Sequence, residues 1–144
     1  MEQRDTVRFG VIGCGLMGRE FASASARWLH LNGSLPRPAI VAACDLNESN
    51  LAWFRNDPDT RYFYSDYHEL LQNPEVEAVY CAVPHHLHAQ VYCDVIRAGK
   101  HLIGEKPFGM DLAAFEAIEA AMHERPDVFV RCASEFPFYP AVQQ

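Results

Sequence analysis

The sequence predicts an α/β fold, a doubly wound parallel sheet with helices on both faces. Segments typical of strands and segments typical of helices alternate along nearly the whole chain. Such alternation requires crossover connections, which make the strands parallel and cover both faces of the sheet. A glycine-rich turn joins the first expected strand to the first expected helix. The length of 144 residues fits one domain of this kind.

The first strand is expected at residues 7–12, a short and mostly apolar run. A helix is expected at residues 16–31, because apolar residues recur there at three- and four-residue steps and would form one stripe. The stripe consists of Met17, Phe21, Ala24, Trp28 and Leu31. A loop at residues 32–38, with one glycine and two prolines, ends this helix. The apolar run at residues 39–44 predicts the second strand.

The rest of the chain continues the alternation. Further strands are expected at residues 62–64, 76–83, 101–104 and 128–133. Further helices are expected at residues 49–56, 67–71, 87–98 and 112–125. Asp66 and Asp111 each precede a helix and can accept a hydrogen bond from its first amides. Gly99 follows another helix, at the position where helix ends favour glycine.

Composition argues against several classes of protein. The net charge of −7 repels phosphate backbones at long range, so nucleic acid is not expected as a partner. The five cysteines form no CxxC pair and are odd in number, which is typical of reduced thiols in a cytoplasmic protein. The polar residues 1–5 do not resemble a leader, and no apolar run approaches the roughly 20 residues of a membrane span.

Residues 13–18, with the sequence GCGLMG, match the pattern G-x-G-x-x-G. Here the pattern follows an expected strand and opens an expected helix, which is the context of a Rossmann-type dinucleotide site. Gly13 allows the tight turn, Gly15 lets the backbone approach a pyrophosphate, and Gly18 lets the helix pack close to the sheet. The helix N-terminus offers its amides to the phosphates. The alternative is a plain glycine-rich turn, and Cys14 is interpreted as a small spacer rather than a reactive thiol.

Asp45 closes the second strand and indicates which dinucleotide is bound. The fingerprint expects an acidic residue about 20 residues beyond the glycines, and the loop at residues 32–38 accounts for the greater spacing here. A carboxylate can accept hydrogen bonds from ribose hydroxyls and repels a 2′-phosphate, and residues 46–49 contain no lysine or arginine. We therefore predict NAD over NADP. The alternative is that Asp45 only caps the next helix.

Glu105, Lys106 and Pro107 follow the strand expected at residues 101–104. A lysine at the carboxyl end of a parallel strand lies toward the ligand crevice of such a sheet. Its amine can give or take a proton during hydride transfer, and Glu105 can tune or orient it. Pro107 rigidifies the turn and is a candidate for a cis peptide bond. The alternative is a solvated surface lysine.

Three histidines, His85, His86 and His88, follow Pro84 at the end of another strand. Zinc ligands are usually more widely spaced and include a cysteine or carboxylate, and adjacent histidines cannot easily face one ion. We therefore predict no metal site. The turn is expected to contact the nicotinamide side of the cofactor, with His88 at the start of the next helix. The alternative is a set of helix-cap and surface histidines.

The order and spacing of these segments resemble the N-terminal half of the glucose–fructose oxidoreductase/inositol dehydrogenase (Gfo/Idh/MocA) family. The resemblance rests on residues 11–18, Asp45, residues 79–88 and residues 99–107, of which the Glu-Lys-Pro segment is the most specific. In that family the lysine of Glu-Lys-Pro lies at the active site and assists catalysis, and Lys106 matches it. The residues expected to contact the cofactor are Gly13, Cys14, Gly15, Leu16, Met17, Gly18, Asp45, Val83, Pro84, His85, His88, Glu105 and Lys106.

The resemblance implies hydride transfer between NAD and a hydroxyl-bearing carbon of a sugar, cyclitol or similar polyol. It also implies a homo-oligomeric full-length protein. Residues 1–134 would form the dinucleotide-binding domain, and residues 135–144 would begin the crossover to an absent substrate domain. The isolated chain is then expected to bind NAD weakly and to turn over little or no substrate. The alternative function is a non-catalytic NAD-responsive binding module.

Overall fold

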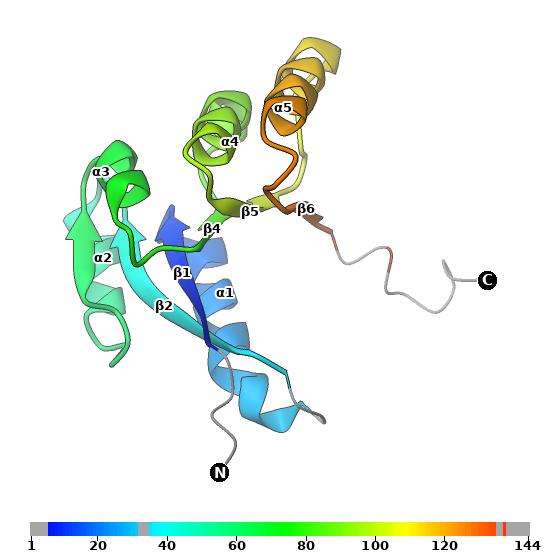
Figure 1. Cartoon of the computed structure of the whole chain (residues 1–144). Helices are drawn as coiled ribbons and strands as arrows, with labels where there is room; N and C mark the ends of the chain where they lie inside the picture. The colour runs from blue at the N-terminus through cyan, green and yellow to red at the C-terminus, as the bar shows by residue number, and fades with distance from the viewer. Residues whose placement is uncertain (1–5, 32–34, 135–136, 138–144) are drawn as a thin grey trace.

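The computed structural model describes residues 6–31, 35–134 and 137. Residues 1–5, 32–34, 135–136 and 138–144 lie outside the described part, and they include part of the predicted loop at residues 32–38 and nearly all of the predicted crossover at residues 135–144. The described residues form one six-stranded parallel sheet with the order β3-β2-β1-β4-β5-β6 (Figure 1). The strands are β1 Thr6–Ile12, β2 Arg37–Cys44, β3 Tyr62–Tyr64, β4 Ala78–Cys81, β5 His101–Glu105 and β6 Val130–Ala133. This order confirms the predicted doubly wound, Rossmann-type fold.

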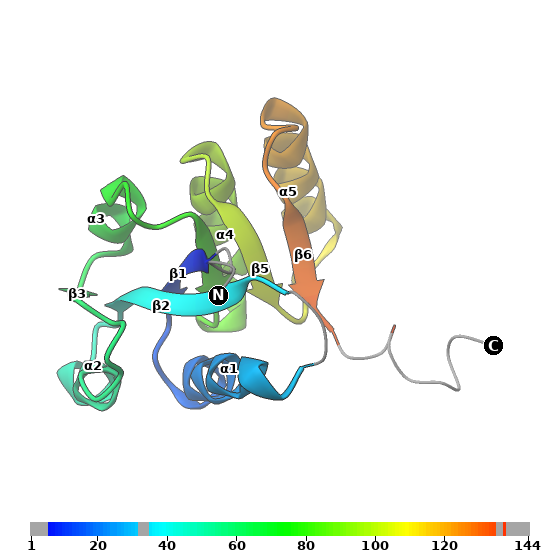
Figure 2. The same cartoon turned by 60° about the horizontal axis from the view of Figure 1, so that its bottom comes forward.

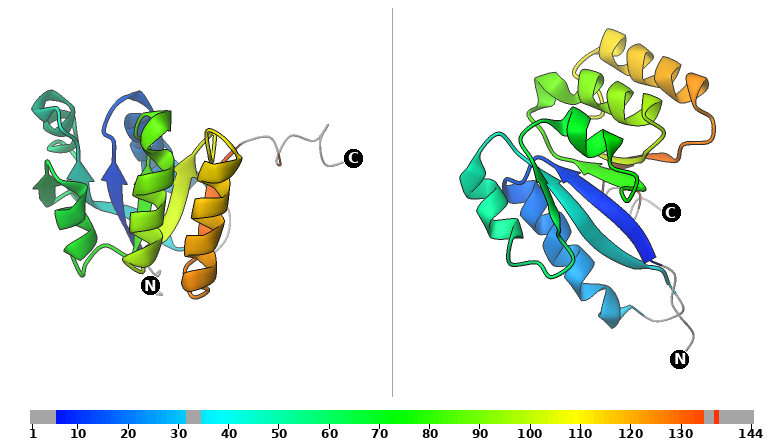
Figure 3. Two further views of the ribbon diagram at one scale, coloured as in Figure 1. Left: turned by 90° about the horizontal axis from the view of Figure 1, so that it is seen from above. Right: turned by 60° about the vertical axis from the view of Figure 1, so that its left-hand side comes forward.

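Helices cover both faces of the sheet, as predicted. They are α1 Leu16–Ala26, α2 Glu48–Phe54, α3 Tyr67–Gln72, α4 His88–Arg97 and α5 Leu112–Glu124, with short 3-10 helices η1 Arg27–His30 and η2 His85–Leu87. Figure 2 shows α1 and α2 on one face and α3, α4 and α5 on the other, and Figure 3 shows the latter three side by side. No helix in the described part of the chain is long and apolar enough to span a membrane.

Alternate residues of the central strands build two separate cores. Val79 and Cys81 of β4 face α3, α4 and α5, whereas Ala78 and Tyr80 face α1 and α2. This is the two-residue period of a strand buried on both faces. The sheet is therefore a rigid central layer whose strand ends, rather than its faces, are available for a ligand.

The first helix differs from its prediction in length and in orientation. The α-helix ends at Ala26 and continues as η1 to His30. Met17, Ala24 and Leu31 of the predicted apolar stripe are exposed, and the buried residues of α1 are Gly18 and Ala22. Gly18 and Ala22 are buried because α1 packs very closely against the turn that precedes it, and Phe21 of the predicted stripe stacks on Tyr80 of β4 with ring centroids 4.3 Å apart.

The predicted helix caps are confirmed. The Asp66 carboxylate accepts a hydrogen bond from the His68 amide at 2.9 Å, and Asp111 accepts one from the Ala114 amide at 2.8 Å. Gly99 has a φ of 77° directly after the C-cap of α4, a conformation that favours glycine. Strands β4 and β6 are shorter than predicted, because the flanking apolar residues lie in irregular segments; these residues are Val76, Ala82, Val83, Val128 and Phe129.

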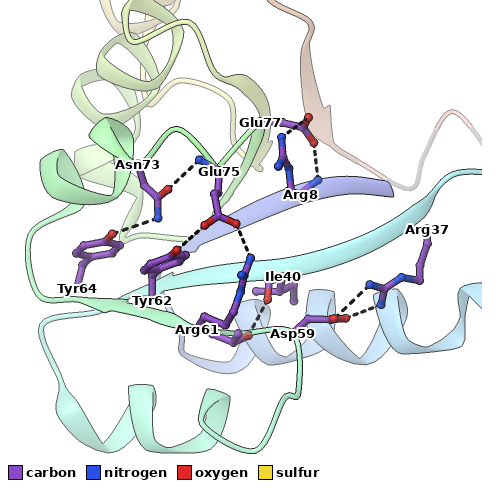
Figure 4. A network of polar contacts seen from close by, with 11 residues as sticks. Arg8, Arg37, Ile40, Asp59, Arg61, Tyr62, Tyr64, Asn73, Glu75 and Glu77 are labelled. Atoms are coloured by element: carbon purple, nitrogen blue, oxygen red, sulfur yellow. Dashed lines mark hydrogen bonds and ion pairs between the residues drawn. The ribbon is translucent and has the colours of Figure 1, made fainter. Parts of the chain in front are cut away.

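Acidic side chains tie strands together at the amino-terminal edge of the sheet (Figure 4). Glu77, just before β4, accepts hydrogen bonds from the backbone amide and the guanidinium of Arg8 on β1, both at 2.9 Å. Glu75 accepts hydrogen bonds from the Tyr62 hydroxyl and from Arg61, the latter at 2.5 Å. These contacts join β1, β3 and β4 at the amino-terminal edge of the sheet. The glycine turn and the later loops lie at the opposite, carboxyl-terminal edge.

We predict that this edge makes the fold sensitive to acid. Hydrogen bonds from Arg8 lower the pKa of Glu77, and those from Tyr62 and then Arg61 lower the pKa of Glu75, both from an ordinary value of 4.5. Because the folded pKa values lie below the unfolded ones, this stabilisation is present above pH 4.5 and is lost as the pH falls through the folded values. Urea midpoints measured from about pH 6 to about pH 3 should fall, and less steeply for Glu77→Gln.

The matched control is Glu119→Gln, which removes an exposed carboxylate of α5. This control should keep the wild-type dependence of the urea midpoint on pH. An acid dependence that is the same in Glu77→Gln as in the wild type would contradict the role given to the Arg8–Glu77 pair.

Candidate functional site

The predicted site residues lie at one edge of the sheet. They follow β1, β2, β4 and β5, which are neighbours in the sheet, and the carboxyl ends of parallel strands meet at the same edge. The strand order reverses between β1 and β4. From β1 the sheet continues to β2 and β3 on one side, and from β4 it continues to β5 and β6 on the other side. Ligands of open α/β sheets bind in the crevice outside the strand ends at such a switch point.

Each of the three glycines of the first turn occupies its position for a different physical reason. Gly13 has a φ of 90°, and a Cβ there would lie 2.5 Å from the Ala82 carbonyl oxygen. A Cβ on Gly18 would lie 2.3 Å from the Gly13 carbonyl oxygen, which explains the close approach of α1. A Cβ on Gly15 would meet no atom within 4 Å. The protein itself therefore requires glycine at the first and third positions, whereas the second leaves open space for a ligand.

The N-terminus of α1 points its amides toward this open space. Gly15 is the N-cap and supplies no side-chain hydrogen bond, and the first turn contains no acidic residue. Leu16 and Met17, the next two residues, are exposed. The partial positive charge of the helix end is thus not neutralised by a cap, which suits an anionic group such as a phosphate.

Asp45 lies against the glycine turn. Its Oδ2 accepts a hydrogen bond from the Cys14 backbone amide at 2.8 Å and another from the Asn50 side chain at 3.1 Å, and its Oδ1 accepts one from the Asn47 amide at 2.8 Å. The N-cap of α2 is Asn47, whose side chain accepts a hydrogen bond from the Ser49 amide at 3.0 Å. The alternative that Asp45 only caps α2 is therefore wrong.

Cys14, one of the predicted cofactor contacts, already has a partner within the protein. Its side chain is fully buried, and its backbone amide is already donated to Asp45. Burial, followed by the nearby Asp45 carboxylate, raises the pKa of the thiol to about 12. Cys14 is therefore a spacer with an unreactive thiol, in agreement with the spacer interpretation of the sequence.

Two residues of this half of the site were missed by the sequence analysis. Asn50 on α2 holds Asp45, and Nη2 of Arg19 on α1 lies 3.4 Å from the Asn50 Oδ1. The Nε atom of Arg19 is buried without a hydrogen-bond partner. Residues 46–49 contain no lysine or arginine, but Arg19 of α1 places a cation close to Asn50, which contacts Asp45. Only the packing of α1 beside α2 brings these residues together, so no local sequence signal could have identified them.

Lys106 is exposed directly after β5, and its peptide bond to Pro107 is cis. Within the described part of the chain its ammonium makes no hydrogen bond or ion pair. The Glu105 carboxylate beneath it is 7% exposed and accepts hydrogen bonds from the Tyr80 hydroxyl at 2.6 Å and the Lys106 amide at 3.2 Å. Burial and the hydrogen bond to Glu105 raise the pKa of Tyr80.

Glu105, another of the predicted cofactor contacts, also has partners within the protein. Both carboxylate oxygens are used inside the protein. These contacts agree with the orienting role considered for Glu105, because its carboxylate accepts a hydrogen bond from the Lys106 amide and Lys106 itself is exposed.

His88, a third predicted cofactor contact, lies inside the protein. The residue is 0% exposed, and its ring nitrogens face two backbone carbonyl oxygens, those of Pro107 at 2.7 Å and Val83 at 3.0 Å. Both ring nitrogens of His88 thus lie against backbone carbonyl oxygens, while His85 and His86 are exposed. Among the described residues no group of histidine, cysteine and carboxylate side chains could hold a metal ion.

A cavity of about 470 Å³ lies elsewhere in the described part of the chain. It is lined by residues of α1, η1, α2, the start of β2 and the loop before β3, including Trp28, Trp53, Arg37 and Asp59. It shares no residue with the crevice at the carboxyl ends of the strands. The site is therefore defined by the glycine turn, Asp45 and Lys106 and not by this cavity.

Comparisons with known proteins agree with this geometry. A sequence model described as an oxidoreductase family with an NAD-binding Rossmann fold matches residues 7–131. Trans-1,2-dihydrobenzene-1,2-diol dehydrogenase of Mus musculus is 30% identical over 95% of this chain and 39% of its own length. Inositol 2-dehydrogenase/D-chiro-inositol 3-dehydrogenase of Lactiplantibacillus plantarum is 26% identical over 77% of this chain and 30% of its own length.

Among solved structures, levoglucosan dehydrogenase in complex with NADH and L-sorbose is similar with a TM-score of 0.86. It is 26% identical, and the likeness covers 96% of this chain and 37% of that chain. The 144 residues thus span well under half the length of the relatives that they match.

Proposed function

The chain belongs to the Gfo/Idh/MocA oxidoreductase family with its NAD-binding Rossmann fold, and we propose that it binds NAD for hydride transfer to or from a hydroxyl-bearing carbon of a sugar, cyclitol or similar polyol. The names of the relatives support this substrate class, since they include an inositol dehydrogenase and a dihydrodiol dehydrogenase. Bound NAD supplies the carbon that accepts or donates the hydride. The protein supplies binding, orientation and proton transfer.

The open space at Gly15 carries this proposal. The protein gives no steric reason for glycine there, while an uncapped helix end and the Asp45 carboxylate flank the same space. The first-turn amides, at Leu16 and Met17, would hold the diphosphate, and Asp45 would accept hydrogen bonds from the adenosine ribose. A carboxylate at that position disfavours a 2′-phosphate, which supports NAD over NADP.

Lys106 is the candidate catalytic residue. Its exposed Nζ would take the proton of the substrate hydroxyl or polarise the oxygen, while Glu105 holds its backbone. Val83, Pro84 and His85, in the turn after β4, would contact the nicotinamide side of the cofactor. This turn lies beside the Lys106 turn because β4 and β5 are neighbours.

Further parts of the proposal concern the protein beyond this crevice. The relatives are more than twice as long, which supports a substrate pocket formed mostly by residues without a counterpart here, with residues 135–144 as the crossover. We also propose a homo-oligomeric, cytoplasmic protein without nucleic-acid partners. The free cysteines and the net charge of −7 support the last two points.

Gly15→Ala should weaken NADH binding by at least about tenfold, because the new methyl group occupies the space of the diphosphate. The free energy of unfolding should change by no more than about 0.5 kcal/mol, because the Cβ meets no protein atom. NADH fluorescence titration and urea unfolding provide the two measurements. Ser23→Ala, on the exposed side of the same helix, is the control and should change neither. Unchanged NADH affinity in Gly15→Ala would refute the proposed site.

The wild-type chain should bind NADH at least about tenfold more tightly than NADPH, and Asp45→Asn should narrow that ratio. The substitution keeps the shape of the side chain and removes the charge that repels a 2′-phosphate. Glu48→Gln removes a nearby charge that pairs with Arg55 at 2.7 Å, and it should leave the ratio unchanged. Tighter binding of NADPH than NADH by the wild type would overturn the assignment.

Lys106→Ala in the complete protein should lower the rate of polyol oxidation at least about a hundredfold, because it removes the proton-transfer group. The NADH dissociation constant should stay within about threefold of the wild type. The readout is NADH formation from NAD and a polyol such as inositol. A rate that does not change would favour the non-catalytic NAD-responsive module instead.

A further inference from the structure

Arg19 places a guanidinium close to the acidic residue of the crevice. It follows Gly18 on α1, and α1 and α2 cover the same face of the sheet (Figure 2). Its Nη2 donates a hydrogen bond to the Asn50 Oδ1 at 3.4 Å, and the Asn50 amide donates one to the Asp45 Oδ2 at 3.1 Å. A positive charge therefore lies one amide group away from the carboxylate that is proposed to hold the adenosine ribose.

The Nε atom of this guanidinium is buried without a hydrogen-bond partner. A buried donor without an acceptor is destabilising, and native proteins rarely keep one unless it serves binding or catalysis or meets a water or an ion. Arg19 forms no ion pair with any described residue, whereas Arg55, at the end of α2, already pairs with Glu48 at 2.7 Å. An acceptor from outside the chain would satisfy Arg19, and its positive charge favours an anion.

The charges of Arg19 and Asp45 act on the same corner of the crevice. Burial, followed by the Asp45 carboxylate, raises the pKa of the Cys14 thiol, whereas Arg19 acts on that pKa in the opposite direction. The residues that directly follow Asp45, at positions 46–49, contain no lysine or arginine. A phosphate bound at this corner would therefore meet the negative charge of Asp45 and the positive charge of Arg19 together.

We propose that Arg19 is a specificity-determining residue whose guanidinium contacts a 2′-phosphate on the adenosine ribose, so that the ratio of NAD to NADP affinity is set by Asp45 acting against Arg19. The inference rests on the proposed function, which places the ribose at Asp45. The guanidinium fork matches the oxygens of a phosphate, and an arginine near the ribose can accommodate a 2′-phosphate. Asp45 prevails in the wild type, because three hydrogen bonds hold its carboxylate at the corner.

Arg19→Gln tests this contact in fluorescence titrations with NADH and with NADPH at one ionic strength. NADPH should bind at least about tenfold more weakly, the effect of one lost hydrogen bond to a charged group, while the NADH dissociation constant stays within about threefold of the wild type. Arg27→Gln removes the same charge from the exposed C-cap of α1 and should change neither affinity. A loss that is equal for the two cofactors, or no loss for either, overturns the proposal.

The same substitution in the Asp45→Asn background gives a sharper test. There the guanidinium meets the phosphate without a competing carboxylate, so Arg19→Gln should weaken NADPH binding at least about thirtyfold, more than in the wild type. Arg19→Lys keeps the charge without the fork and should weaken NADPH binding by only about threefold. If Asp45→Asn binds NADPH equally well with arginine or glutamine at position 19, its gain comes from lost repulsion alone and the contact is disproved.

The same titrations separate this inference from the proposed function. Failure of the wild-type chain to bind NADH would refute the NAD site and, with it, the role of Arg19. Binding of NADH together with an NADPH affinity that does not depend on Arg19 would refute only that role. Where the wild type binds NADPH too weakly to titrate, Asp45→Asn supplies the measurement, and absence of NADPH binding there contradicts the contact. If urea unfolding shows that Arg19→Gln is not folded, the comparison is made with Arg19→Lys.

Discussion

The hydrogen bond from the Cys14 amide to the Asp45 carboxylate, 2.8 Å long, holds the turn after β1 against the end of β2. The shape of the crevice depends on it, because this contact sets how far the glycine turn lies from the acidic residue. Gly13 fits against Ala82 and Gly18 fits against Gly13 only while that turn keeps its place. The same arrangement leaves the space at Gly15 open and aims the end of α1 toward it.

The half of the crevice around Lys106, after β4 and β5, is held together by buried polar side chains. An exposed lysine stands on a buried polar layer, in which Tyr80 and Glu105 hold the backbone of Lys106 and His88 joins the two turns above the sheet. Buried polar groups of this kind are costly unless they are paired, and here each has a partner. A proton-transfer group needs a backbone that is held in place beneath its exposed side chain.

The sequence predicted the strands, the order of elements and the caps at Asp66, Asp111 and Gly99 well, because these depend on local periodicity and turn chemistry. It was less successful with α1, whose predicted stripe of Met17, Ala24 and Leu31 is exposed. Hydrophobic periodicity assumes that the largest apolar side chains face the core. Here the close approach of α1 at Gly18 buries Gly18 and Ala22, and Phe21 of the predicted stripe packs on Tyr80.

The sequence by itself determined the fold class, the glycine turn, Asp45 and Lys106, because each is marked by residue type and by its place between a strand and a helix. Tertiary structure alone decided that Cys14, Glu105 and His88 lie inside the protein and support the crevice from beneath. It also decided that Asn50 and Arg19 meet beside Asp45. Their partners are distant along the chain, so their burial and hydrogen bonding follow from how the strands and helices pack, which no local pattern encodes.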